Sequence, residues 1–116
     1  MRALICVVAF SVVAVAQETV YQPKDGVVLP RVVREVKAAY TQEARDAHLE
    51  GTVFVRAVVK SDGTVGDVSV ERSLDPTYGL DQAAVDATKA WLFKPGTKDG
   101  KPVAVSVGIE HTFKLK

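Results

Sequence analysis

Cysteine is almost absent from this chain of 116 residues, since Cys6 is the only one. It lies in the first apolar stretch, so the remainder of the chain has no thiol for a disulfide or a metal site. The sequence also lacks a Ser-centred elbow, a phosphate-binding Gly-rich loop and a zinc signature. The two histidines, His48 and His111, do not stand at a metal-ligand spacing. These absences predict a non-catalytic protein without a metal or cofactor.

Long apolar runs are missing as well, apart from residues 3–16, where Ser11 is the only polar residue. At about 1.5 Å per residue a helix of this length reaches about 21 Å, less than the ~30 Å of a bilayer core. Arg2 precedes the run and small residues end it at Ala16. This pattern predicts a signal peptide over residues 1–16, cleaved after Ala16. A retained leader that anchors the chain is the alternative.

An excess of charge of either sign is missing from the chain after this leader. Residues 17–116 carry 14 basic and 14 acidic side chains, with no long basic run. Nucleic acid and an anionic membrane are therefore poor candidates for a partner. One hundred residues suffice for one domain with a modest core. We divide the chain into a signal peptide (1–16), a connector (17–39) and a folded domain (40–116).

The most regular pattern in the sequence spans residues 103–115. Its odd positions are almost all apolar and its even positions are small or polar. Because side chains alternate between the two faces of a strand, this pattern predicts a long half-buried β-strand. His111 interrupts the apolar face, which favours a partly buried histidine near the end of the sheet over a ligand.

Periodicity and turn residues predict the other elements. We expect strands over 52–59 and 65–72, joined by a tight turn at 61–63, and helices over 41–49 and 80–91. A short strand is expected around 27–29, whereas residues 31–39 are compatible with helix or strand. Asp81 is expected to be a solvated residue on the polar side of the second helix.

Chain handedness orders the strands. A crossover helix makes strands 65–72 and 103–115 parallel, so the last strand can pair antiparallel with 52–59. The sequence thus predicts an α+β fold, a three-stranded antiparallel sheet in the order 2-1-3 with two helices on one face. The other face would expose, among others, Phe54, Val58, Ser106 and Thr112.

The last strand becomes an edge of this sheet, and an edge allows three interpretations. It can be a plain final strand whose charges, such as Glu110 and Lys114, discourage aggregation. It can accept an extended peptide by strand addition, with Gly108 allowing close approach of a foreign backbone. It can also pair with its twin in a homodimer.

Residues 40–116 resemble the C-terminal domain of TonB-type energy transducers. Four features carry the resemblance: a Tyr-led helix before a Glu-Gly-x-Val strand, a hairpin, a helix ending in aromatic-x-aromatic-x-Pro, and a closing strand. In this chain the first feature is Tyr40–Arg45 with Glu50–Val53, and the hairpin is Asp62-Gly63 with Asp67-Val68. The helix is Leu80–Ala84 with Trp91, Phe93 and Pro95 at its exit. The closing strand has Gly100, Pro102 and Val103 at its start and Phe113 and Leu115 at its end. The Pro that follows Tyr in the family is Thr41 here, which can cap the helix.

The resemblance implies a periplasmic module whose last strand binds an extended segment of outer-membrane transporters. The implied peptide-binding residues are Val105, Ser106, Val107, Gly108, Ile109, Glu110 and His111, flanked by Tyr40. Members transmit work from a proton-driven inner-membrane motor through an anchor and a long Pro-rich spacer, whereas only residues 17–39 separate leader and domain here. We therefore expect a stand-alone domain associated with TonB-dependent transport. An anchored energy transducer is the alternative if the leader is retained.

Overall fold

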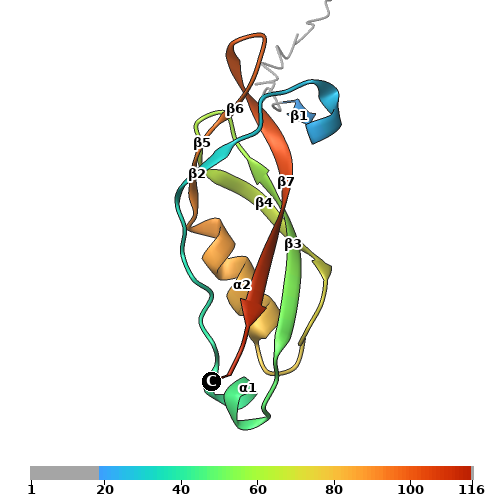
Figure 1. Ribbon diagram of the computed structural model, residues 1–116, viewed down its shortest axis with the longest axis vertical. Coiled ribbons are helices and arrows are strands. Elements are labelled where there is room, and N and C mark those ends of the chain that lie inside the picture. The colour runs from blue at the N-terminus through green and yellow to red at the C-terminus, as the bar shows by residue number, and fades with distance from the viewer. Residues whose placement is uncertain (1–18, 116) are drawn as a thin grey trace, which may run out of the picture.

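The structure is a computed structural model that describes residues 19–115 (Figure 1). Its elements are β1 (Val20–Tyr21), the 3-10 helix η1 (Pro23–Asp25), β2 (Arg31–Arg34), α1 (Gln42–Asp46), β3 (Gly51–Val59), β4 (Val65–Arg72), α2 (Leu80–Lys89), β5 (Leu92–Lys94), β6 (Gly96–Lys98) and β7 (Lys101–Phe113). The signal peptide predicted over residues 1–16 lies outside the described residues. Within the described part, no helix has the length and apolar character needed to cross a bilayer.

The main sheet confirms the predicted class and strand order. β4, β3 and β7 are neighbours in that order, and β3 is antiparallel to both of its partners. The register between β3 and β7 runs from Gly51 opposite Phe113 to Val59 opposite Val105. The sheet nevertheless has more strands than predicted. β1 is added parallel to β7 on its other edge, and β6 forms a hairpin with the start of β7.

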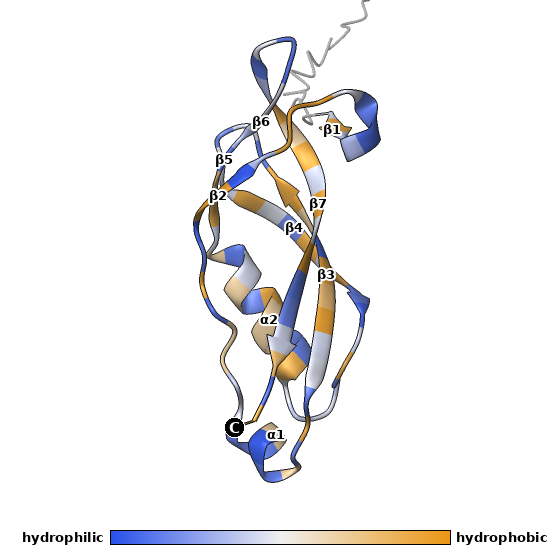
Figure 2. Cartoon of the chain, viewed as in Figure 1, coloured by the Kyte–Doolittle hydropathy of each residue, from blue (hydrophilic) through white to orange (hydrophobic). Residues whose placement is uncertain are grey.

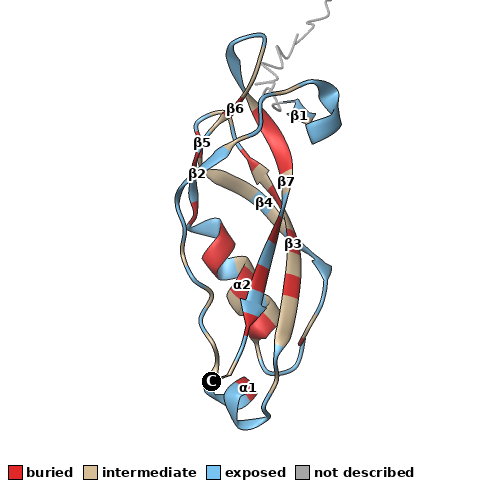
Figure 3. Ribbon diagram, in the orientation of Figure 1, coloured by how far each residue is buried: buried red, intermediate tan, exposed pale blue. Residues whose placement is uncertain are grey.

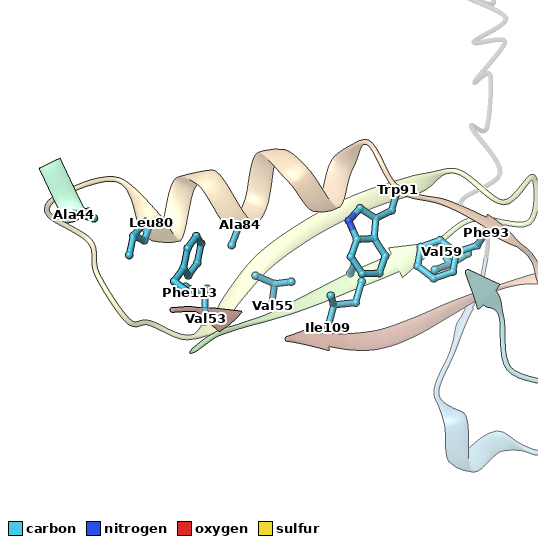
Figure 4. Packing of buried hydrophobic residues seen from close by; sticks show 11 residues of the cluster. Ala44, Val53, Val55, Val59, Leu80, Ala84, Trp91, Phe93, Ile109 and Phe113 are labelled. Carbon is cyan, nitrogen blue, oxygen red and sulfur yellow. The ribbon is translucent and has the colours of Figure 1, made fainter. Parts of the chain in front are cut away.

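The hydrophobic core lies between α2 and the main sheet (Figure 4). Small side chains on α2, such as the fully buried Ala84, let the helix approach the inward valines of β3 closely. Trp91 and Phe93 fill the far end of this layer, with ring centroids 6.0 Å apart. α1 is shorter than predicted and lies at the end of the sheet (Figure 1), although Thr41 caps it as expected by accepting from the Ala44 N–H at 3.2 Å.

The turn between β3 and β4 is packed directly against β5. Gly63 has a φ of +88°, and a Cβ built there would lie 2.1 Å from the carbonyl oxygen of Phe93. The Phe93 N–H in turn donates to the Gly63 carbonyl oxygen at 2.8 Å. Only glycine satisfies both the backbone angle and this close approach. β5, which the sequence did not predict, therefore owes its position to a tertiary contact.

Asp75 organises the loop between β4 and α2 from a position that is only 3% exposed. Its carboxylate accepts the backbone N–H groups of Thr77, Tyr78 and Leu80 at 3.0, 2.8 and 3.3 Å. The Thr41 hydroxyl donates to the Tyr78 carbonyl oxygen at 2.7 Å, so the same loop also holds the start of α1.

Asp81, in the first turn of α2, ties this helix back to the end of β4. Its carboxylate accepts the N–H groups of Leu74 and Asp75 at 3.0 and 2.9 Å, together with the Ser73 hydroxyl. Burial by itself raises the pKa of Asp81, but these hydrogen bonds outweigh burial and hold the pKa below its usual value. The prediction that Asp81 is merely solvated was wrong.

The connector is docked on the domain along much of its length. β2 pairs antiparallel with β5, so the ambiguous residues 31–39 begin as a strand. The strand expected around 27–29 is only an isolated bridge between Val28 and Thr97. Further along, the Trp91 Nε1–H donates to the Val36 carbonyl oxygen at 2.7 Å.

Candidate functional site

The candidate site is the outer edge of β7, the side that faces away from β3. β1 occupies this edge only at Ala104 and Val105. Among residues 19–115, no strand pairs with the edge from Ser106 to Phe113. Val105, one of the predicted peptide-binding residues, pairs with Val59 on one side and Tyr21 on the other. It therefore does not belong to the open edge, which begins at Ser106.

Hydrogen bonds at Lys60, just after β3, show which backbone groups of β7 face the open edge. The Lys60 N–H donates to the Thr64 carbonyl oxygen, and the Lys60 carbonyl oxygen accepts from the Gly63 N–H, both at 2.8 Å. Lys60 therefore faces β4, and alternation turns Val59 and every second residue before it towards β7. Through the register, the odd residues of β7 point their N–H and C=O groups at β3. The even residues point theirs outward, namely Ser106, Gly108, Glu110 and Thr112.

The side chains of β7 follow the predicted alternation over most of the edge (Figure 3). Ile109, His111 and Phe113 are buried, whereas Gly108, Glu110 and Thr112 are exposed. Ser106 is an exception, because it is only 5% exposed although it was predicted to be solvent-facing. β1 and η1 lie against β7 near the start of the open edge, where the sequence predicted no cover.

Gly108 has a role within the fold that the sequence did not suggest. A Cβ at this position would lie 2.6 Å from Cζ of Phe54, so the missing side chain makes room for the Phe54 ring. The Arg56 guanidinium lies 5.9 Å from the centroid of that ring and forms a salt bridge of 2.9 Å with Glu71. On this face of the sheet the Phe54 ring fills the space above Gly108, an arrangement in which an aromatic side chain covers a glycine of a strand.

His111 is a buried structural residue, as predicted. Its Nε2 lies 2.7 Å from the Thr88 hydroxyl, and the ring packs edge-on against Trp91 with centroids 5.6 Å apart. The Thr88 hydroxyl donates its single hydrogen to the Ala84 carbonyl oxygen at 2.7 Å. It can therefore only accept from His111, which places a proton on Nε2. Burial lowers the pKa of His111, and the nearby negative charge of Glu35 opposes this effect.

A pH dependence of stability follows from this lowered pKa. Because His111 binds a proton less readily in the folded chain, its contribution is fully present above the unfolded pKa of about 6.5 and is lost as the pH falls through the folded value. We expect urea unfolding to show a larger loss of stability from pH 8 to pH 5 in the native chain than in His111→Gln. The glutamine amide can still donate to Thr88 but does not titrate. Equal losses in the two proteins would contradict this assignment.

A hollow of about 970 Å³ lies at the C-terminal end of the open edge. Its apolar wall includes Tyr40 and Phe113, and all of its charged side chains are cationic, namely Lys37, Arg45 and Lys114, with His48 beside them. A chain added along the edge would run towards this hollow, since Thr112 and Phe113 belong to both. The cations favour an acidic group there.

Tyr40 is a fixed wall of the hollow. Its ring packs edge-on against Phe113 with centroids 5.4 Å apart, and its hydroxyl donates to the Leu49 carbonyl oxygen. The Arg45 guanidinium lies 5.1 Å from the ring centroid. The structure thus brings Tyr40 to the end of the edge that carries the other predicted residues. No group of three His, Cys, Asp or Glu side chains in the described part of the chain could hold a metal ion.

Comparison with known proteins agrees with this architecture. The family model of the Gram-negative bacterial TonB protein C-terminal matches residues 36–115. Protein TonB of Vibrio cholerae is 35% identical over 85 residues, which are 73% of this chain and 34% of that protein. Protein TonB of Xanthomonas campestris is 36% identical over 76 residues, covering 66% of this chain and 34% of that protein.

A solved structure shows the same fold. The solution NMR structure of the Pseudomonas aeruginosa TonB CTD matches with a TM-score of 0.62 and 27% sequence identity, covering 82% of this chain and 93% of that one. The chain spans about a third of the length of the curated relatives it matches. Since the family model covers most of the described residues, this protein belongs to the TonB C-terminal family.

Proposed function

We propose that this protein is a non-catalytic periplasmic module that binds an extended peptide segment by strand addition at β7, in association with TonB-dependent transport. The observation that supports this most is the open edge of β7 beyond β1, where the outward N–H and C=O groups of Gly108, Glu110 and Thr112 have no strand partner among residues 19–115. Membership of the TonB C-terminal family supports the link to transport.

The proposed ligand is a short extended segment of an outer-membrane transporter. At about 3.3 Å per residue, the open edge offers about 26 Å to an added strand. Each backbone hydrogen bond contributes about 1 kcal/mol net, so several of them correspond to binding near the micromolar range. The cationic hollow beyond Thr112 favours a segment with an acidic side chain at the end that reaches it.

A titration with a synthetic peptide from the N-terminal segment of an outer-membrane transporter tests this proposal. We expect NMR amide shifts first along residues 106–113 of the labelled protein, with a dissociation constant near the micromolar range. Shifts confined to α2 or to the β3–β4 turn would contradict it.

A homodimer through the same edge is the competing use of β7. Sedimentation at rising protein concentration separates the two, because a dimer would hide the edge before any peptide is added. A monomer at high concentration that still binds peptide supports strand addition, whereas a dimer that excludes peptide overturns it.

A further inference from the structure

In the small sheet formed by β2 and β5, Phe93 points into the core, whereas all four residues of β2 are exposed, including Val32 at 51%. Phe93 of β5, opposite Val32, is 8% exposed and belongs to the core cluster. Its neighbours Leu92 and Lys94 alternate to the opposite, outer face and are both exposed. We call the surface formed by Leu92 and Lys94, with Arg31 and Arg34 opposite them, the β2–β5 face.

Cations are placed against one another on the β2–β5 face. Arg31 lies directly opposite Lys94, and Arg34 lies opposite Leu92 across a register shift. Like charges at directly opposed positions destabilise a strand pair, so this arrangement costs stability in the isolated chain. Among residues 19–115 the only salt bridge joins Arg56 and Glu71, so none of these three cations has an ion-pair partner there.

Apolar side chains accompany these cations. Val33 is 68% exposed and Leu92 is 39% exposed, while Val28 and Leu29, just before β2, are 66% and 51% exposed. Figure 2 shows the apolar stretch between η1 and β2, and β2 itself has two valines between two arginines. Large exposed apolar side chains gathered next to unpaired cations mark an interaction surface.

We propose that the β2–β5 face contacts an anionic phospholipid surface. The cations would lie at the lipid phosphates, and the valines and leucines would enter the boundary between headgroups and acyl chains. The hollow at the end of β7 does not include these residues.

Although the balanced charge of residues 17–116 predicted no affinity for an anionic membrane, the fold concentrates cations on one face. Near an anionic surface each Lys or Arg changes the partition by about 5-fold. The proposed attachment is therefore weak, reversible and sensitive to salt. It is independent of peptide binding at β7, which lies along a different surface.

Vesicle co-sedimentation of the protein purified from the cell envelope tests this inference. We expect at least about 5-fold stronger binding to vesicles of phosphatidylglycerol and phosphatidylethanolamine than to phosphatidylcholine vesicles. Arg31→Glu should abolish most of this difference and also create an ion pair with Lys94. That variant should thus be at least as stable as the native chain while binding lipid at least about 5-fold less.

Arg72→Glu, at the exposed end of β4 opposite Phe54, makes the same change of charge away from the β2–β5 face, so it is the matched control and should retain vesicle binding. Equal binding of the native protein to both kinds of vesicle would overturn the proposal. The absence of binding to either kind of vesicle, as expected if an acidic protein is the true partner, would also overturn it. So would unchanged vesicle binding by Arg31→Glu.

Discussion

Replacing Glu110 with proline should weaken binding of the extended peptide at least about 10-fold while leaving the domain folded. The affinity falls because one hydrogen bond to the peptide is lost and the proline ring obstructs the peptide backbone. The Glu110 N–H points away from β3, so proline removes a donor of the open edge and none from the β3–β7 ladder. Proline is tolerated in edge strands at positions of this kind. Isothermal titration with the transporter peptide measures the effect.

The matched control is Glu110→Ala, which removes the same side chain but keeps the backbone N–H. Because Glu110 is exposed and pairs with no cation in the described residues, we expect its alanine variant to bind within about 2-fold of the native chain. Equal binding by the proline and alanine variants would show that the peptide does not use this edge.

Replacing Asp75 with alanine should reduce the free energy of unfolding by about 3 kcal/mol, a large part of the ~5–15 kcal/mol typical of a domain. The substitution leaves the N–H groups of Thr77, Tyr78 and Leu80 without their acceptor, and that of Leu80 is buried. Urea unfolding followed by circular dichroism measures the loss.

Two other variants test whether the lost hydrogen bonds of Asp75 cause this loss of stability. Asp75→Asn keeps an oxygen for part of the hydrogen bonds and should cost less than alanine. Asp86→Ala, on the exposed side of α2 where its partner is Gln82, should change stability by no more than about 0.5 kcal/mol. If Asp75→Ala lowers the free energy of unfolding no more than Asp86→Ala does, Asp75 does not have the organising role in the loop that we assign to it.

The elements that the sequence predicted well are those with a long local pattern. The alternation in β7, the alanine stripe of α2 and the Asp62-Gly63 turn each determine their structure over several successive residues, and the order of β4, β3 and β7 then follows from handedness. The capping role of Thr41 was also predictable, since it depends on residues a few positions apart.

The elements that the sequence did not predict depend on distant contacts. β1, β5 and β6 are two or three residues long, too short for periodicity, and each is defined by the strand it meets. Asp81 resembles any helix-surface carboxylate in sequence, because the N–H groups that it accepts belong to the loop between β4 and α2.

The candidate site was predictable as an edge but not in its extent. Nothing in the sequence signals that Tyr21 would reach Val105, so the open edge begins one residue later than predicted. The direction of each backbone group was equally hidden, because it requires the register between β3 and β7 in addition to the turn at Lys60. The cationic hollow combines residues from three separate parts of the chain.

Amide hydrogen exchange along β7, with and without the transporter peptide, tests the account most directly. In the free protein we predict fast exchange at Gly108, Glu110 and Thr112 and slow exchange at Val107, Ile109 and His111. With saturating peptide, the first three amides should become slow while the second three stay unchanged. Slow exchange at the even residues before peptide is added, or no change on adding it, would show that the edge is not the binding surface.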